Sequence, residues 1–317
     1  MAQAVSLAST KRLSRDDWLE IRRQGIGSSD AAAVAGLNPY RSPLCVYLDK
    51  RGERPEEEST ERMQLGILME PVIAELYHRR TGTHPRRRNA VLAHPDRPWM
   101  LANLDYEAKD PVLGWGLVEC KNSGYGKQWD EDEAPVMYII QALHQLEVTG
   151  RAFCDLAALI GGAKLVITRV LPDREAIAGL VQIEADFWQR VQEERPPEVD
   201  GSPDCAQALK IMYPQAAPGS EVILPDTARA VLRDLTTARK VLKACEADVT
   251  RRENEIKALM GDAERAYLAG IEKPVVTWKT SSSTRLDAKR LAAEEPELAA
   301  RFRSVTESRR FLVKESL

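Results

Sequence analysis

The chain has 317 residues, 44% of them hydrophobic and 29% charged, which is the balance of a globular protein rather than of a disordered or fibrous one. By the usual size of domains it holds one large domain or two. No apolar run is long enough to span a bilayer, and the first ten residues lack the apolar region of a signal peptide. We therefore expect a cytoplasmic protein with no membrane partner.

The charge of the chain is unevenly distributed. A net charge of −3 by itself argues weakly against a nucleic-acid partner, because neutralising phosphates requires Lys and Arg on the contacting face. Basic residues gather in the segments 11–23, 78–88 and 301–310, whereas 53–61 is acidic. These runs are compatible with a basic groove on an acidic protein and equally with solvated surfaces.

The first third of the chain predicts helices around a glycine-containing loop. Ser14, Asp16 or Asp17 can cap a helix over 18–23, which ends at the loop 25–29 before an alanine-rich helix from residue 30. From 63 to 77 the apolar residues recur at intervals of three and four, which predicts an amphipathic helix. Glu70 lies within this helix.

The middle of the chain predicts strands. Alternation over 100–105 and again over 116–121 indicates two adjacent strands, joined as a hairpin through the turn region 111–114. A helix over 135–149 follows. Two apolar segments at 155–160 and 165–171, joined by Gly161 and Gly162, indicate a second hairpin before a helix over 173–194.

A turn-rich segment after residue 195 ends this pattern and suggests a domain boundary. The organisation we predict is an α+β domain over 1–195 with a central mixed β-sheet flanked by helices, a linker over 196–219, and an appendage over 220–317. The appendage should contain one long charged helix over 225–260 and short strands near 275–279 and 310–313.

Chemistry is expected at the end of the strand 116–121. Side chains two residues apart in a strand face the same way, so Glu119 and Lys121 share one surface and Cys120 points to the other. Asp105 on a neighbouring strand can reach the same surface. Two carboxylates suit a hard cation such as Mg²⁺, and a nearby ammonium can stabilise charge on a phosphate oxygen, which are the requirements of phosphodiester hydrolysis.

Further motifs accompany this arrangement in order along the chain. They are Trp18-Leu-Glu-Ile-Arg22 followed by Gly25-Ile-Gly-Ser-Ser29-Asp30, then Gly66-Ile-Leu-Met-Glu70, and finally Tyr138-Ile-Ile-Gln141. With these motifs the segment 15–195 resembles the phage-borne YqaJ family of recombination nucleases, relatives of lambda exonuclease. Each motif is unspecific when taken alone, and the combination is specific.

The resemblance implies a restriction-endonuclease-like α/β/α core that digests linear double-stranded DNA in the 5′-to-3′ direction with Mg²⁺, for which Mn²⁺ can substitute. By the same resemblance Asp105, Glu119 and the backbone carbonyl of Cys120 are metal ligands, and Lys121 is the catalytic lysine. Glu70 resembles the helix glutamate that approaches a second metal position. The alternative is that Glu70 has no catalytic role and is a glutamate on the solvent-facing side of the helix.

The resemblance also assigns DNA contacts and partners. Arg22, helped by Ser29, resembles the arginine that grips a terminal 5′ phosphate, and Gln141 resembles a glutamine beside the scissile phosphate. Arg23 is an alternative to Arg22, which we prefer because Trp18 keeps its four-residue spacing to it. The family suggests a homotrimeric ring around DNA and a single-strand annealing recombinase that receives the 3′ strand.

Two rival functions remain open at this point. A Cas4-like nuclease with an iron–sulfur cluster needs four converging cysteines, and the five here are scattered in sequence. A non-catalytic DNA-binding adaptor could assemble through the long helix 225–260 by coiled-coil contacts. The intact set of Asp105, Glu119 and Lys121 argues against lost catalysis.

Overall fold

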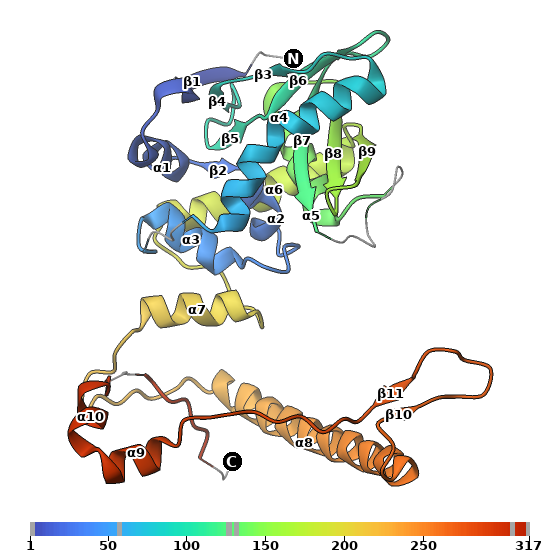
Figure 1. The fold of residues 1–317 in the computed structure, drawn as a ribbon. Helices are drawn as coiled ribbons and strands as arrows, with labels where there is room; N and C mark the ends of the chain where they lie inside the picture. Colours follow the sequence, from blue (N-terminus) through green and yellow to red (C-terminus); the bar gives the residue numbers. More distant parts are fainter. Residues whose placement is uncertain (1–3, 56–58, 125–128, 130–132, 305–307, 315–317) are drawn as a thin grey trace. The chain divides into compact units, whose positions relative to one another are not determined.

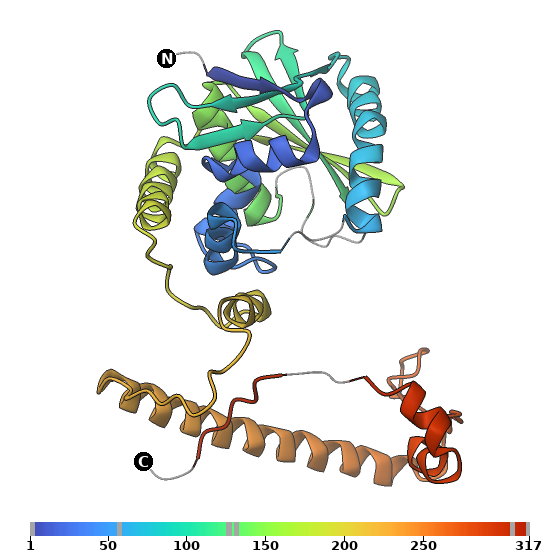
Figure 2. The same ribbon diagram turned by 90° about the vertical axis from the view of Figure 1, so that its left-hand side faces the viewer.

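The computed structural model describes residues 4–55, 59–124, 129, 133–304 and 308–314. The chain divides into two compact units, residues 1–213 and 214–317. Figures 1 and 2 show most of the strands, together with several helices, in the first unit, and one long helix in the second. Each unit is described by itself.

The first unit contains two β-sheets. A four-stranded sheet has the order β1-β4-β5-β2, and a five-stranded sheet has the order β3-β6-β7-β8-β9. In the larger sheet β7 runs parallel to β8 and every other neighbour is antiparallel, so the sheet is mixed. The strands are β1 (Val5–Ser9), β2 (Ile26–Gly27), β3 (Arg86–Arg87), β4 (Ala90–Ala93), β5 (Met100–Asn103), β6 (Tyr106–Asp110), β7 (Gly114–Ser123), β8 (Cys154–Ile160) and β9 (Lys164–Val170).

Helices flank these strands, which confirms the predicted α+β class with a mixed sheet. The 3₁₀ turn η1 spans Thr10–Arg12, and the helices are α1 (Arg15–Arg23), α2 (Ser28–Val34), α3 (Pro43–Arg51), α4 (Glu61–Thr81), α5 (Val136–Thr149), α6 (Arg174–Gln192) and α7 (Pro203–Met212). The helices expected over 18–23, 63–77, 135–149 and 173–194 correspond to α1, α4, α5 and α6. The second glycine hairpin is formed by β8 and β9.

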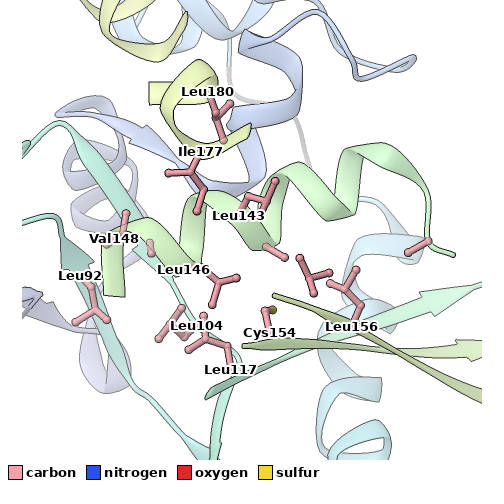
Figure 3. Close-up of a cluster of buried hydrophobic side chains, with 14 of the residues drawn as sticks. Leu92, Leu104, Leu117, Leu143, Leu146, Val148, Cys154, Leu156, Ile177 and Leu180 are labelled. Carbon is pink, nitrogen blue, oxygen red and sulfur yellow. The ribbon is translucent and has the colours of Figure 1, made fainter. Parts of the chain in front are cut away.

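The main core lies between α5 and the large sheet. Leu146 of α5 points toward Leu104 and Leu117, whereas Leu143 lies on the side of Ile177 and Leu180 of α6 (Figure 3). Leu117, Leu143, Leu146 and Leu156 are all at least 96% buried. On the opposite side α4 packs against β7, β8 and β9 (Figure 1). Strands β7 and β8 are therefore covered on both faces, which explains why β8 is apolar at nearly every position.

The predicted pairing of the strand 100–105 with 116–121 is wrong. Strand β5 stops at Asn103 and pairs with β4 and β2 in the smaller sheet, whereas the hairpin partner of β7 is β6. The chain crosses from one sheet to the other at Leu104 and Asp105, which belong to neither strand. The apolar residues at positions 100, 102, 104, 106 and 108 keep one two-residue period across the break, which concealed it in the sequence.

Gly25 allows α1 to approach the smaller sheet. A Cβ atom at this position would lie 2.3 Å from the carbonyl oxygen of Trp99. The next residue, Ile26, donates its N–H to that oxygen at 2.7 Å, and β2 then runs parallel to β5. This close approach fixes where α2 begins, and with it the positions of Ser28, Ser29 and Asp30.

The segment 196–219, which we expected to be a linker, contains the helix α7. Its residue Asp204 accepts the N–H of Ser42 at 2.8 Å, at the start of α3. Beyond it the second unit has α8 (Thr227–Met260), β10 (Arg265–Ala266), β11 (Val276–Thr277), α9 (Ala288–Glu294) and α10 (Pro296–Arg301). The strand expected near 310–313 is wrong, because residues 308–314 form no strand. Among the helices that the structure describes, none is long and apolar enough to cross a membrane.

Candidate active site

The end of β7 directs its side chains to two different helices. Glu119 and Lys121 face α5, where both contact Gln141. Cys120 faces α4, where its thiol lies 3.7 Å from the carbonyl oxygen of Glu70. The alternation expected from the sequence therefore holds at these three positions.

Glu119 is the centre of a buried hydrogen-bond network. One oxygen, Oε1, accepts from Lys121 Nζ at 2.8 Å and from Gln141 Nε2 at 2.6 Å. The other, Oε2, accepts from Gln145 Nε2 at 2.8 Å. Gln141 also accepts from Lys121 at 3.0 Å through its own oxygen. The network holds the carboxylate in one orientation, because both of its oxygens have donors.

Sequence reasoning missed Gln145. It lies one helical turn after Gln141 on the same face of α5, so the spacing of four residues was the available signal. Its side chain is completely buried and also lies 3.5 Å from the hydroxyl of Ser28 at the start of α2. Gln145 thus connects Glu119 to a second part of the site.

Asp105 reaches the cluster because β6 does not extend alongside the last residues of β7. The pairing of β6 with β7 ends at Tyr106 and Val118, and two residues farther along β7 the N–H of Cys120 donates to Asp105 Oδ2 at 2.9 Å. In a β-strand, the N–H and C=O groups of any one residue point toward the same side of the strand. The carbonyl of Cys120 is therefore directed toward the side where Asp105 lies.

Glu70 approaches from α4 and is engaged by Arg87 of β3 in an ion pair. The Glu70 side chain is only 20% exposed, which disagrees with the alternative that it is a solvent-facing residue without a role. Sequence reasoning did not identify Arg87 as its partner. The two positions are seventeen apart in the sequence, and only the tertiary structure brings them together.

Burial and neighbouring charges shift the pKa values of Asp105, Glu70 and Lys121. Burial and the nearby charges of Glu119 and Glu70 raise the pKa of Asp105 well above its ordinary value. Burial also raises the pKa of Glu70, against the opposing effect of Arg87. Burial lowers the pKa of Lys121, but the carboxylates of Glu119 and Asp105 outweigh it, so the pKa is raised and the ammonium stays charged.

The donor set agrees in chemistry with a hard divalent cation. Asp105, Glu119 and Glu70 supply carboxylate oxygens, the Cys120 carbonyl is directed the same way, and added positive charge would relieve the repulsion that raises the pKa of Asp105. In the described part of the chain, however, no three His, Cys, Asp or Glu side chains converge as a ready cage. Glu119 and Glu70 are instead held by Lys121, the two glutamines and Arg87.

Beside the start of α2 a second cluster is built around a buried acid. Asp30 is fully buried and accepts from Arg22 Nη2 at 2.9 Å and from Lys50 Nζ at 2.7 Å. Arg22 also donates to the hydroxyl of Ser29 at 3.2 Å and stacks over Trp18. The predicted pair of Arg22 and Ser29 is thus brought together, and sequence reasoning missed Lys50.

A cleft lined by basic side chains lies next to Asp30; we call it the basic cleft. Its lining includes six cationic side chains, Arg15, Arg22, Arg23, Arg41, Lys50 and Arg54, with Asp49 among them. Part of the basic segment 11–23 therefore contributes to a concave surface. Ser28 is directed toward Gln145 and Ser29 toward Arg22, so consecutive residues connect the Glu119 network with this cleft.

Comparison with known proteins identifies the relatives of the chain. Residues 17–152 match the model of the YqaJ-like viral recombinase domain. The chain is 33% identical over 319 residues to the uncharacterized protein YqaJ of Bacillus subtilis (strain 168), and the match covers 99% of this chain and 98% of that protein. The chain belongs to the YqaJ family. The family resemblance expected from the motifs is therefore confirmed.

Solved structures show weaker likenesses to this YqaJ-family chain. The alkaline exonuclease LHK-Exo of Laribacter hongkongensis has a TM-score of 0.46 at 21% identity, covering 56% of this chain and 93% of that one. The same enzyme in complex with dAMP has a TM-score of 0.47 at 23% identity, with the same coverage. Likenesses of this degree are too weak to assign an activity.

Arg22 and its neighbour Arg23 have different surroundings in this YqaJ-family protein. Arg22 is anchored by Asp30, whereas Arg23 pairs with Glu20 at 3.4 Å on the same turn of α1. Both line the basic cleft. The contact with Ser29, which the resemblance also named, is made by Arg22.

Four of the cysteines are buried in three apolar clusters, and the fifth is exposed. Cys45 and Cys205 share one apolar cluster, Cys120 and Cys154 belong to two others, and Cys245 is exposed on α8. Within the residues described, no metal-holding group of three includes any of them. Nothing in this arrangement favours an iron–sulfur centre.

Proposed function

We propose that this protein is a metal-dependent deoxyribonuclease that digests linear double-stranded DNA from 5′ ends and leaves 3′ single strands for homologous recombination. The observation that carries the proposal is the cluster at the end of β7. There Lys121 lies 2.8 Å from Glu119 and 3.0 Å from Gln141, next to Asp105. Membership of a family described as viral recombinases agrees with a role at DNA ends.

In this proposal the residues of the cluster have separate roles. Asp105, Glu119 and the Cys120 carbonyl would hold Mg²⁺ or Mn²⁺, and Glu70 would approach a second ion after releasing Arg87. A bound ion would supply an activated water and positive charge at the reacting phosphate. Lys121, kept charged by its neighbours, stabilises negative charge on a phosphate oxygen, and Gln141 orients Lys121 and Glu119 together.

The basic cleft is assigned to the terminal 5′ phosphate. Arg22 can offer a planar guanidinium, and Ser29 a hydroxyl, to a phosphate dianion that an internal phosphodiester does not match. Asp30 holds Arg22 in place from below. The cleft and the Glu119 cluster are connected through Ser28 and Gln145. This proximity is required if one DNA strand is bound by both.

The assembly expected from the family resemblance is a homotrimeric ring with a basic lining, acting together with a single-strand annealing recombinase. A ring would reconcile the net charge of −3 with DNA binding, because the positive side chains would gather inside. Light scattering at micromolar concentration tests this point. A monomeric mass combined with retained processive digestion would contradict the ring.

The proposed activity is tested by digesting DNA with different ends. We expect Mg²⁺-dependent digestion of linear duplex DNA, loss of label from 5′ ends before 3′ ends, and no attack on closed circular DNA. The Lys121→Ala protein serves as the control for contaminating nucleases. Equal digestion of closed circles and linear DNA would exclude an exonuclease, and no digestion by the folded protein would favour the adaptor alternative.

A further inference from the structure

Tyr138 lies one helical turn before Gln141, at the start of α5. It is the first residue of the motif Tyr138-Ile-Ile-Gln141, and its N–H donates to the carbonyl oxygen of Pro135 at 2.8 Å. Side chains three residues apart lie on the same side of a helix. Tyr138 and Gln141 accordingly both reach Lys121 at the end of β7, the first through its ring and the second through its amide oxygen.

The ammonium group of Lys121 lies over the face of the Tyr138 ring. Its nitrogen, Nζ, is 4.8 Å from the ring centroid, a distance at which the electrons of an aromatic face attract a cation. The same nitrogen donates to Glu119 at 2.8 Å and to Gln141 at 3.0 Å. Three side chains from β7 and α5 therefore contact one ammonium group.

Trp129 restricts the orientation of the Tyr138 ring. The two rings stack with their centroids 5.3 Å apart and their planes at 24°. Trp129 is buried and belongs to the main apolar core, and Tyr138 packs against the same core. A ring that is packed in this way has few alternative orientations, so it offers a fixed surface to the cation beside it.

We propose that Tyr138 is a positioning residue for Lys121, and that its ring face holds the ammonium where Glu119 and Gln141 bind it. A lysine ammonium has three N–H donors, and the two hydrogen bonds occupy two of them. A ring face attracts the cation without requiring an N–H directed at an acceptor atom. The third donor therefore stays available for a phosphate oxygen. The inference rests on the proposed nuclease function, because it concerns the lysine of that reaction.

Two substitutions separate the ring face from the space that it fills. Tyr138→Phe keeps the face, whereas Tyr138→Leu keeps much of the apolar volume without it. On linear duplex DNA, Tyr138→Leu should lower the maximal rate about 2- to 30-fold, the range expected for the loss of one cation–π contact. The DNA concentration that gives half of the maximal rate should stay the same, since the contact does not involve DNA. Tyr138→Phe should digest DNA nearly as fast as the natural protein.

A double-mutant cycle tests the contact without DNA. Denaturant unfolding is measured for the natural protein, Tyr138→Leu, Lys121→Met and the double variant. The unfolding equilibrium constant of the double variant should differ about 2- to 30-fold from the value expected if the two effects were independent, with the double variant the more stable. Tyr47 of α3 is a buried tyrosine in another apolar cluster, and the same cycle with Tyr47→Leu should give independent effects.

Three results would overturn the proposal. If Tyr138→Leu digested DNA as fast as Tyr138→Phe, the ring would only fill space. If Tyr138→Leu raised the DNA concentration for half-maximal rate and left the maximal rate unchanged, the ring would bind DNA. Independent effects of Tyr138→Leu and Lys121→Met on unfolding would mean that the two side chains do not stabilise each other.

The two measurements also separate this inference from the proposed function. If the natural protein digested no DNA, the proposed nuclease function would be wrong. The unfolding cycle would still decide whether Tyr138 holds Lys121, because it requires neither DNA nor Mg²⁺.

Discussion

Gln145 donates through Nε2 to Oε2 of Glu119 at 2.8 Å, and both side chains are almost completely buried. Replacing Gln145 with Met removes the donor while keeping a similar volume. Glu119 then loses the contact that fixes one of its oxygens, and it should bind a cation less well. We expect digestion to need about 10- to 100-fold more Mg²⁺ for half-maximal rate, the usual effect of removing such an outer contact.

The control for this variant is Gln189→Met, which alters an exposed glutamine of α6. It should leave the Mg²⁺ dependence unchanged. If Gln145→Met lowered the maximal rate without shifting the Mg²⁺ dependence, Gln145 would act on the reacting groups rather than through a metal ligand. Thermal melting of both variants in EDTA separates either effect from a loss of folding.

Removal of any one of Asp105, Glu119 and Lys121 should abolish Mg²⁺-dependent cleavage. Alanine at each position is expected to lower the rate by at least about 100-fold, the scale on which one electrostatic group at a reacting centre is felt. Asp105→Asn is the sharper variant, because an amide oxygen can still accept the N–H of Cys120. Its melting temperature should stay near that of the natural protein while activity is lost.

The exposed acid Glu75 on α4 provides the comparison for these substitutions. Glu75→Ala removes a carboxylate that pairs with Arg79, and the variant should cleave normally. Near-normal cleavage by a well-folded Asp105, Glu119 or Lys121 variant would show that the active site lies elsewhere.

Arg22→Ala should slow digestion of 5′-phosphorylated ends far more than of 5′-hydroxyl ends. A charge-assisted hydrogen bond contributes roughly 1.5 to 3 kcal/mol, so a loss of about tenfold to a few hundredfold is expected for phosphorylated ends. Lysine at position 22 should restore only part of the rate, because it lacks the planar fork. The two rates are measured on the same preparation.

Because Arg22 pairs with Asp30, its removal also disturbs a buried acid. A purely structural role would lower the melting temperature and slow both kinds of end equally. Arg23→Ala is the matched control. If it changed the ratio of the rates on phosphorylated and hydroxyl ends more than Arg22→Ala does, Arg23 would be the residue that binds the 5′ phosphate.

Asp30→Asn should destabilise the protein strongly. It leaves Lys50, Arg22 and Arg41 around an uncharged group, and breaking a buried ion pair in this way costs about 3 to 5 kcal/mol. Denaturant unfolding measures the loss. Adding Lys50→Met should recover part of it, because the second change removes the uncompensated buried charge. A double variant no more stable than Asp30→Asn would contradict this account.

Asp30 should also make the stability of the folded protein decrease at acidic pH. Burial raises the pKa of Asp30, but the charges of Arg22, Lys50 and Arg41 outweigh it, so the pKa lies well below its ordinary value. A depressed pKa in the folded state stabilises the protein above the unfolded value of about 3.9, and this contribution is lost as pH falls through the folded value. Asp30→Asn should therefore unfold with a shallower acid dependence.

His144 should make stability fall at alkaline pH. Its ring lies between two acceptors, Glu184 at 2.8 Å and the carbonyl of Leu101 at 2.9 Å, so both nitrogens must carry protons. Burial lowers the pKa of His144, but Glu184 and the carbonyl outweigh it, and the pKa is raised. The stabilisation is complete below the unfolded value of about 6.5 and is lost as pH rises through the folded value.

Melting temperatures at pH 6 and pH 9 test this, with His144→Gln as the comparison. The natural protein should lose more stability between the two values than the variant does. An equal loss in both proteins would mean that His144 is neutral in the folded state.

Local periodicity in the sequence determined much of this protein. The three- and four-residue spacing of apolar side chains predicted α4, and the two-residue period of β7 placed Glu119 and Lys121 on one face with Cys120 on the other. Such patterns are readable because a side chain's direction in a helix or strand depends only on its nearest neighbours along the chain. The family could also be identified from short motifs, which depend on spacing alone.

Only the tertiary structure decided which distant residues meet. Lys50 reaches Asp30 across twenty positions, Arg87 reaches Glu70 across seventeen, and Gln145 reaches Glu119 across twenty-six. The strand before Asp105 was assigned to the wrong neighbour for the same reason. Pairing between elements depends on how α4, α5 and the two sheets pack, and the pattern of polar and apolar residues along each element is compatible with more than one such packing.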